Sequence, residues 1–486
     1  DGLIWVTHDG GGHWQDVTPK GLSAWSKVIM LDASHTDAGT AYAAIDRHRL
    51  NDYTPHVLRT RDAGKTWQEV IEGLPGNAYV QAIKEDPDRP GLLFAGTSIG
   101  VYVSFDAGDQ WQSLRLNMPV VEIRDFAFHG NSVAIATFGR SLWILDDLAP
   151  LHQLDAAVAN ASVHLYRPET AVLKPGDNHD RRDTDLAVST NLTPIDVASG
   201  APRMKGALLD YYLKSAAGGP VTLDILDAGG KVIRHYSSTT KYPAVDPKSL
   251  NVPAVWISTP APLPATAGMH RFSWDLRAIA ADGHGATDVD AFGGHTVLPG
   301  TYTVKLTVDG QSYTQPLTVV QHPVTQQDPA ALAARSTMVQ QIIGLQTQVA
   351  TAERAVKGLR QQLAALRGQA GASAAMTRAI AGVDGQAREI EGHAPPPLPD
   401  TTGVGDAAPA ADSLMGLAQM LAGMSTTTQE SSGAPTTAGL AGLDKLRQEV
   451  AATLARWNQF QDKDVTRLNT KLQKAGLPAL KTVAGG

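Results

Sequence analysis

One short pattern occurs three times near the start of the chain and limits what this region can fold into. The pattern is Ser/Thr-x-Asp-x-Gly-x-x-Trp, and its copies span residues 7–14, 60–67 and 104–111. The step is 53 residues from Asp9 to Asp62 and 44 residues from Asp62 to Asp106. This is the length of one four-stranded propeller blade. The repeat therefore predicts consecutive β-propeller blades over residues 1–150.

Each residue type in the pattern has a physical role in a tight turn. A short aspartate side chain can accept backbone N–H bonds, glycine permits a positive φ, and tryptophan can pack under the hairpin. We therefore expect the pattern to join the third and fourth strands of a blade and to serve structure rather than chemistry. Its members are Thr7, Asp9, Gly11, Trp14, Thr60, Asp62, Gly64, Trp67, Ser104, Asp106, Gly108 and Trp111.

Strand-like segments around the repeats make up two complete blades and two partial ones. The first partial blade has only its third and fourth strands, LIWVT and WQDV, and the last has three strands, RDFAFH, SVAIATF and SLWILDD. A propeller has at least about four blades and leaves no long open edge. We therefore expect further blades in the same full-length chain, and the alternative is that another chain supplies them.

The loops between the second and third strands of the blades are expected to open on one face, opposite the repeated turns. General acid–base catalysis on a glycoside needs two carboxylates in different environments, and the same face could instead bind a sugar or a peptide. The alternative is structural, with Arg140 pairing across a blade boundary and Asp52 and Tyr53 capping the turn before Pro55. The candidate catalytic residues are Asp46, His48 and Asp52, and the candidate ligand-binding residues are Arg47, Tyr53, Thr97, Ser98 and Arg140.

Several segments resemble one family of proteins. LNDYTPHVLRTRDAGKTWQEVIEGLP and ATFGRSLWILDD resemble the Asp-box (BNR-repeat) β-propellers of bacterial secreted proteins, a sortilin-type and glycosyl-hydrolase-like family. GMHRFSWDLR and VLPGTYTVKLTVDG resemble the sandwich that follows the propeller there, so the chain resembles a C-terminal portion. Phe138 stands where a histidine is expected.

This resemblance implies a secreted or periplasmic protein with one of two functions. The first is a carbohydrate-active protein that binds a glycan or hydrolyses a glycoside, with a polysaccharide as its partner. The second is a non-enzymatic propeller of the sortilin type that binds a peptide or protein or serves as a scaffold. The resemblance does not extend to any catalytic aspartate of the xyloglucanase relatives.

Residues 163–322 are predicted to form an immunoglobulin-like β-sandwich after a link over 151–162. Short strands with alternating apolar residues follow one another with glycine-containing turns between them. Phe272 and Trp274 are expected in the core. The segment 281–295 contains aspartates and histidines that could hold Ca²⁺, but it lacks a complete ligand pattern, so a solvated loop is favoured.

Apolar residues from Met338 to Leu366 recur in alternating steps of four and three. This heptad pattern predicts a long helix that packs along another helix, with 439–474 as its expected partner. We predict an antiparallel helical bundle over 327–482, and a coiled-coil dimer, hence a homo-oligomer, is the alternative. Shorter helices are expected near 373–392 and 411–424, and linkers at 393–406 and 425–437.

Composition excludes several classes of function. The chain of 486 residues has no cysteine, which excludes disulfides, thiolate metal sites and cysteine nucleophiles. Its net charge is −7 and its basic residues are scattered, which argues against a nucleic-acid surface. No apolar run approaches the roughly 20 residues of a membrane span. No phosphate loop or GxSxG motif occurs, and we expect no cofactor or metal.

Overall fold

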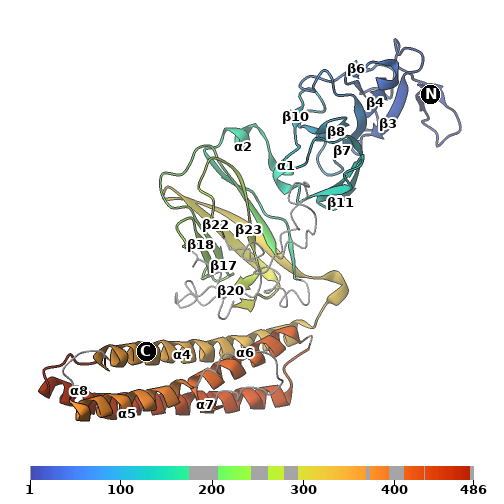
Figure 1. The fold of residues 1–486 in the computed structure, drawn as a ribbon. Coiled ribbons are helices and arrows are strands. Elements are labelled where there is room, and N and C mark those ends of the chain that lie inside the picture. Colours follow the sequence, from blue (N-terminus) through green and yellow to red (C-terminus); the bar gives the residue numbers. More distant parts are fainter. Residues whose placement is uncertain are drawn as a thin grey trace, which may run out of the picture. The chain divides into compact units, whose positions relative to one another are not determined.

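The computed structural model describes residues 2–173, 206–241, 261–278, 294–367, 373–392, 410–431 and 433–481. The chain divides into two compact units. The first contains the sheets of the N-terminal region and a three-stranded sheet, and the second contains a five-stranded sheet and the C-terminal helices (Figure 1). The order of the elements, mainly β strands followed by helices, is the one that the sequence predicts.

Two four-stranded antiparallel meanders lie at the centre of the first unit. One consists of β3 (Lys27–Ala33), β4 (Ala41–Asp46), β5 (Val57–Thr60) and β6 (Gln68–Glu69). The other consists of β7 (Val80–Glu85), β8 (Leu93–Thr97), β9 (Gly100–Ser104) and β10 (Gln112–Ser113). In both sheets neighbouring strands follow in sequence order, as in a propeller blade. We call these sheets the second and third blades.

Two smaller sheets flank them. In one, β1 (Trp5–Val6) pairs with β2 (Gln15–Asp16). In the other, the order is β11 (Ile123–His129), β12 (Ser132–Thr137) and β13 (Leu142–Asp146). We call them the first and fourth blades. The strands lie where the sequence places them, and the two incomplete blades have the two and three strands expected.

The repeated pattern forms the same turn three times. In the second blade, the Asp62 carboxylate accepts hydrogen bonds from Thr60 Oγ1 and from the backbone N–H of Thr66, both at 2.9 Å. The backbone N–H of Gly64 donates to Thr60 Oγ1 at 2.9 Å. The turn joins the third strand to the fourth, as predicted. The same bonds recur at Thr7, Asp9 and Gly11, and at Ser104, Asp106 and Gly108.

The pattern also fixes each blade against the one before it. The Trp67 indole Nε1–H donates to the carbonyl oxygen of Val17 at 2.8 Å. A Cβ added at Gly64 would lie 2.6 Å from the Cβ of Val17, which is closer than two side chains can approach. The glycine is therefore needed for close packing as well as for its φ of 85°. Equivalent contacts recur one blade further on, between Trp111, Gly108 and Val70.

The segment after the fourth blade, expected to be a link, contains two short helices, α1 (Ala149–Gln153) and α2 (Ala156–Asn160). His152 on α1 contacts Asp86 after the third blade's first strand, with 2.9 Å between Nε2 and Oδ2. The three-stranded sheet follows, in the order β14 (Val163–Leu165), β16 (Ala207–Leu213), β19 (Gly268–Trp274).

The second unit contains a five-stranded sheet. Its order is β15 (Ala171–Leu173), β23 (Gln311–Gln321), β22 (Gly300–Val308), β17 (Thr222–Leu226), β18 (Val232–Ser237). The β15–β23 pair is parallel and the other pairs are antiparallel. Strands from 163–322 thus contribute to a sheet in each unit, and the immunoglobulin-like sandwich stays a prediction. Trp274 is fully buried, as predicted, with its ring 5.6 Å from that of Tyr302, whereas Phe272 is half-buried.

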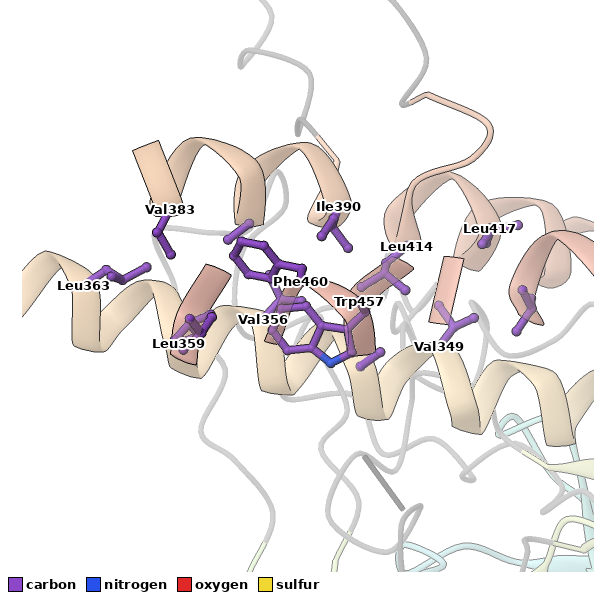
Figure 2. Packing of buried hydrophobic residues seen from close by; sticks show 14 of the residues in the cluster. Val349, Val356, Leu359, Leu363, Val383, Ile390, Leu414, Leu417, Trp457 and Phe460 are labelled. Atoms are coloured by element: carbon purple, nitrogen blue, oxygen red, sulfur yellow. The ribbon is translucent and has the colours of Figure 1, made fainter. Parts of the chain in front are cut away.

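The C-terminal helices bury the predicted heptad positions. All nine apolar residues of the pattern between Met338 and Leu366 are buried, and they join one continuous core that includes Trp457 and Phe460 (Figure 2). The helices are α4 (Pro329–Arg367), α5 (Ala374–Glu391), α6 (Leu414–Glu430), α7 (Thr437–Phe460) and α8 (Thr466–Lys474), with a π-helical turn η5 (Gln461–Val465) between α7 and α8.

Helices α5 and α6 both run antiparallel to α4, and two expectations need correction. Arg335 near the start of α4 contacts Ser431 after the end of α6, so these two helices are antiparallel. Met338 lies near Gly439, and Gln362 bonds to Lys481, so α4 is parallel to the α7–α8 segment that was expected as its main partner. Residues Ser425–Glu430, expected to be a linker, continue α6 because Ser425 and Thr428 are buried. Of the segment 281–295, all but its last two residues lie outside the described residues.

Candidate functional site

A shared irregularity aligns the second, third and fourth blades residue by residue. The first strand of each has a register shift directly after Val28, Val80 or Ile123. The residue before Val28, Lys27, pairs with Asp46 at the end of the second strand. The backbone N–H of Ser98 and that of Phe138 donate to the carbonyls of Tyr79 and Glu122 in the same way. Asp46, Ser98 and Phe138 therefore occupy equivalent positions along one rim of the three blades.

Side chains on this rim contact one another across all three blades. We call the group the rim cluster, and its members are Asp46, His48, Tyr53, Tyr79, Gln81, Glu122, Arg124 and Phe138. The His48 ring stacks on the Tyr79 ring, with centroids 4.7 Å apart and planes inclined by 21°. The Tyr79 hydroxyl donates to Glu122 Oε2 at 3.1 Å. These two contacts join the loop of the second blade to the third and fourth blades.

A second line of contacts runs back along the rim. Arg124 forms an ion pair with Glu122 (Nη2 to Oε1, 2.9 Å) and donates to Gln81 Oε1 at 3.3 Å. Its guanidinium group lies over the Phe138 ring, 4.6 Å from the centroid, a favourable cation–π contact. The fully covered Gln81 lies beside Asp46 and helps to lower its pKa, although Gln81 Nε2 has no hydrogen-bond partner among the described residues.

Asp46 orients His48. The buried Asp46 carboxylate accepts hydrogen bonds from the His48 ring (Nδ1, 2.6 Å) and from the His48 backbone N–H (3.1 Å). Burial disfavours the charge, but these bonds outweigh it, and the pKa of Asp46 is lowered from its ordinary value. An ionised Asp46 can only accept, so Nδ1 of His48 is the donor in this hydrogen bond.

Asp52 anchors the loop that carries Tyr53. Its carboxylate accepts bonds from the Thr54 hydroxyl and backbone N–H, and it lies 3.1 Å from His56 Nε2 and 3.3 Å from Arg47 Nε. The Thr54 hydroxyl is the main cause that lowers the pKa of Asp52 to about 2. Tyr53 itself is 49% exposed, with its ring 6.1 Å from that of Tyr79.

The remaining predicted site residues lie apart from the cluster contacts. Thr97 is fully buried, and its hydroxyl donates to the Gly100 carbonyl at 2.8 Å, so it forms the turn between two strands. Ser98 contributes its backbone N–H to the ladder. Arg140 is exposed; its backbone N–H donates to Thr137 Oγ1 at 3.1 Å, and its side chain has no ion pair with any described residue.

Four members of the cluster escaped the reading of the sequence because they lie at the start of first strands rather than in the loops between second and third strands. These residues are Tyr79, Gln81, Glu122 and Arg124. An alignment of the blades at the register shift reveals them. Tyr79 and Glu122 come directly before Val80 and Ile123, and Gln81 and Arg124 come directly after. The sequence shows no bulge, so this signal was not accessible.

Within the described ranges, no group of three or more histidine and acidic residues could hold a metal ion. The helices of the described part of the chain contain no segment long and apolar enough to cross a membrane.

Comparison with known proteins gives only distant likenesses. No family model and no curated protein matches the chain. Solved structures that resemble it include YCF48 bound to D1 peptide, at 15% identity and a TM-score of 0.24, over 30% of this chain and 44% of that one. The GH74 enzyme of Niastella koreensis matches at 14% identity and a TM-score of 0.21, over 60% of this chain and 38% of that one. The chain thus spans less than half the length of either structure, and the proposal for function rests on the site alone.

Proposed function

We propose that the rim cluster binds a neutral glycan and does not cleave it. Every carboxylate at this site already has a cationic or hydrogen-bond donor partner: Asp46 has His48, Glu122 has Arg124, and Asp52 has Thr54 and His56. Because these carboxylates already accept hydrogen bonds from the protein, a neutral ligand with hydroxyl groups suits the site better than a charged one. A sugar combines hydroxyl groups, which bond to polar side chains, with apolar ring faces, which stack on aromatic side chains.

The observation that carries the proposal is the set of hydrogen bonds that keeps Asp46 and Asp52 ionised. Glycoside hydrolysis needs one carboxyl group whose pKa is raised, so that it can protonate the leaving oxygen. At this site the pKa of Asp46 is lowered and that of Asp52 falls to about 2. Both groups are therefore ionised at neutral pH and can accept hydrogen bonds from hydroxyls, but neither can act as the acid.

Exposed aromatic rings supply the other half of the proposed site. Tyr53, whose ring lies 6.1 Å from that of Tyr79, is 49% exposed, and Phe138, whose ring lies under Arg124, is 66% exposed. The cation–π contact with Arg124 holds Phe138 in place, which lowers the entropy that a ring loses when it binds a ligand. A secreted or periplasmic location belongs to the same proposal, because polysaccharides are found there.

The test is affinity electrophoresis and calorimetry of the complete chain with cellulose, xylan, mannan and starch. We expect binding to at least one polymer without release of reducing sugar. Tyr53→Ala and Phe138→Ala each weaken binding about tenfold, the effect of losing about 1.4 kcal/mol. Trp14→Ala, which removes an exposed tryptophan away from the rim, serves as the control and leaves binding unchanged.

Two outcomes would overturn the proposal. Release of sugar that disappears in Asp46→Asn or Asp52→Asn would identify a glycoside hydrolase. Failure to bind any of the four polymers, together with saturable binding of unstructured peptides that Phe138→Ala weakens, would identify a peptide-binding propeller.

A further inference from the structure

Trp25 has an unusual backbone conformation for its size. It lies in the turn Ser23–Ser26, which is closed by a hydrogen bond from the Ser26 N–H to the Ser23 carbonyl at 3.1 Å. Its φ is 69°, at the third turn position, where a positive φ favours glycine or asparagine. A bulky residue in the left-handed region is strained, so something other than the stability of the turn accounts for tryptophan here.

The turn holds its tryptophan outward. Ser26 is 2% exposed, and its hydroxyl lies 3.1 Å from that of Ser23, which ties the two ends of the turn together. The Trp25 side chain is 87% exposed, the largest exposure of any large apolar side chain among the described residues. An indole ring thus projects into solvent from a rigid base.

Trp25 is exposed because of its position in the blade, and not because it lies at an open edge of a sheet. Trp25 lies three residues before Val28, and the equivalent positions in the next two blades, Asn77 and Val120, are also exposed. Each of those two blades packs against a preceding four-stranded blade. A neighbouring blade therefore leaves this position uncovered.

Trp14 shows the opposite behaviour. It is 58% exposed, but its equivalents Trp67 and Trp111 are half-buried and 5% exposed, because their indole groups pack on the preceding blade. Among the described residues no blade precedes the first one to cover Trp14, whereas Trp25 is exposed at a rim position that a neighbouring blade leaves uncovered. The two tryptophans form a matched pair for experiment.

Trp25 lies on the same rim as the cluster. Only one residue separates it from Lys27, which pairs with Asp46 in the ladder, so its Cα is within about 7 Å of that of Lys27. We infer that Trp25 is a stacking platform for an additional sugar of a polysaccharide whose other sugars lie on the rim cluster. The inference rests on the proposed function and deepens it, because it makes the preferred ligand a chain rather than a single sugar.

The experiment is calorimetric titration of the complete chain with oligosaccharides of increasing length prepared from cellulose, xylan, mannan and starch. We expect the affinity of the wild type to rise with length. Trp25→Ala removes this rise, a loss of about tenfold for the longest ligands, and leaves the affinity for the shortest unchanged. Trp14→Ala retains the whole rise.

A second variant guards against a loss of folding. Trp25→Asn fits the turn, so its melting temperature is expected to equal or exceed that of the wild type while the rise with length still disappears. Equal length dependence in the wild type, Trp25→Ala and Trp14→Ala would overturn the inference and leave the proposed function intact. A wild-type affinity that does not change with oligosaccharide length would also overturn the inference and leave the proposed function intact. Absence of any binding would overturn both the inference and the proposed function.

Discussion

Gly64 in the second blade lies directly against Val17 in the first, and a Cβ on this glycine would be 2.6 Å from the Cβ of Val17. Trp67, three residues later, donates its indole N–H to the carbonyl of the same valine. Val17 thus contacts two repeated residues of the next blade's turn, its glycine and its tryptophan. The pattern that marks each blade in the sequence is in this way also the contact that stacks the blades.

Replacement of this glycine is expected to be costly. Gly64→Ala combines the strain of a positive φ, about 1–2 kcal/mol, with a clash in a packed contact, about 1–3 kcal/mol, so we expect a loss of about 2–5 kcal/mol in the free energy of unfolding. Gly130→Ala is the control, because Gly130 has a φ of 52° and nothing within 4 Å of an added Cβ. Urea unfolding followed by tryptophan fluorescence measures both, and equal losses would contradict the packing role.

Asp147 makes the stability of the first unit depend on pH. Burial raises its pKa to about 6, whereas the unfolded value is about 4. The folded chain therefore holds the proton to higher pH, and its stability falls as the pH rises from about 4 to about 6 and stays low above that. Asp147→Asn keeps an oxygen that can accept from Ala149 N–H and Asn131 Nδ2 and removes the charge.

We therefore expect Asp147→Asn to be more stable than the wild type by about 1–3 kcal/mol at pH 8 and about equal to it at pH 4. Arg271 limits the gain, since it is drawn to the charge of Asp147 and also forms a two-bond pair with Asp210. The measurement is the free energy of unfolding of both proteins across this range. A difference that does not vary with pH would contradict the assignment.

The pair of His152 and Asp86 is expected to stabilise the first unit most at intermediate pH. The hydrogen bond to Asp86 raises the pKa of His152, and the pKa of Asp86 is lowered because bonds from His152 and the backbone outweigh burial. The contribution of His152 is complete below about pH 6.5 and is lost as the pH rises through its raised pKa. That of Asp86 is present above about pH 4 and is lost as the pH falls.

His152→Gln should therefore lower stability most between about pH 4 and 6.5. Because the imidazole is partly exposed, we expect a modest loss of about 1 kcal/mol there and a smaller one at pH 9. Thermal unfolding at several pH values tests this. The prediction fails if the loss at pH 9 equals or exceeds the loss at pH 5.5.

Long periodic patterns made much of the fold predictable. The heptad from Met338 to Leu366 extends over more than seven helical turns, and a buried stripe of that length permits only a helix packed against others. The end of α6 was less predictable. Ser425 and Thr428 belong to a segment rich in serine and threonine, which is typical of a linker. Both are nevertheless buried and the helix continues through them, because tertiary packing overrides intrinsic helix propensity.

The candidate site was predictable only in part. Asp46 and His48 follow a strand in sequence, so their position on a rim could be inferred. Tyr79 and Glu122 reach the same rim from positions directly before first strands, more than 30 residues from His48. Their equivalence is visible only from the bulge that follows Val80 and Ile123 and moves the register by one residue. A shift of this kind leaves no mark in composition or periodicity.

The helical core contains one polar residue that reduces its stability. Gln346 on α4 is 3% exposed, and its Oε1 has no hydrogen-bond partner among the described residues. An unpaired buried acceptor costs about 1–3 kcal/mol. Gln346→Leu is therefore expected to raise the free energy of unfolding of the helices by about 1 kcal/mol, and the exposed Gln348→Leu, two residues away, should change it by less than about 0.5 kcal/mol. Circular dichroism at 222 nm during urea unfolding measures both, and a loss in Gln346→Leu would show that the amide has a partner.

Two exposed turn residues adopt a conformation that suits glycine or asparagine better. Trp25 has a φ of 69° and Leu116 a φ of 48°, and Leu116 is 70% exposed. Counted from the register shift, Leu116 is equivalent to Gly21 and Gly73, both of which have positive φ. Replacement by asparagine relieves strain at either position, so Trp25→Asn and Leu116→Asn should each raise the free energy of unfolding by about 0.5–1.5 kcal/mol.

The two replacements are expected to differ in function. Only Trp25→Asn should weaken the binding of long oligosaccharides, because this replacement removes the aromatic ring proposed to stack on the ligand. Leu116 has no aromatic ring to lose. Melting temperature and glycan affinity measured on the same two preparations separate strain from function. If both variants gain stability and both keep full affinity, the strain at Trp25 has no role in recognition; if Trp25→Asn loses affinity as it gains stability, the strain is the cost of presenting the ring.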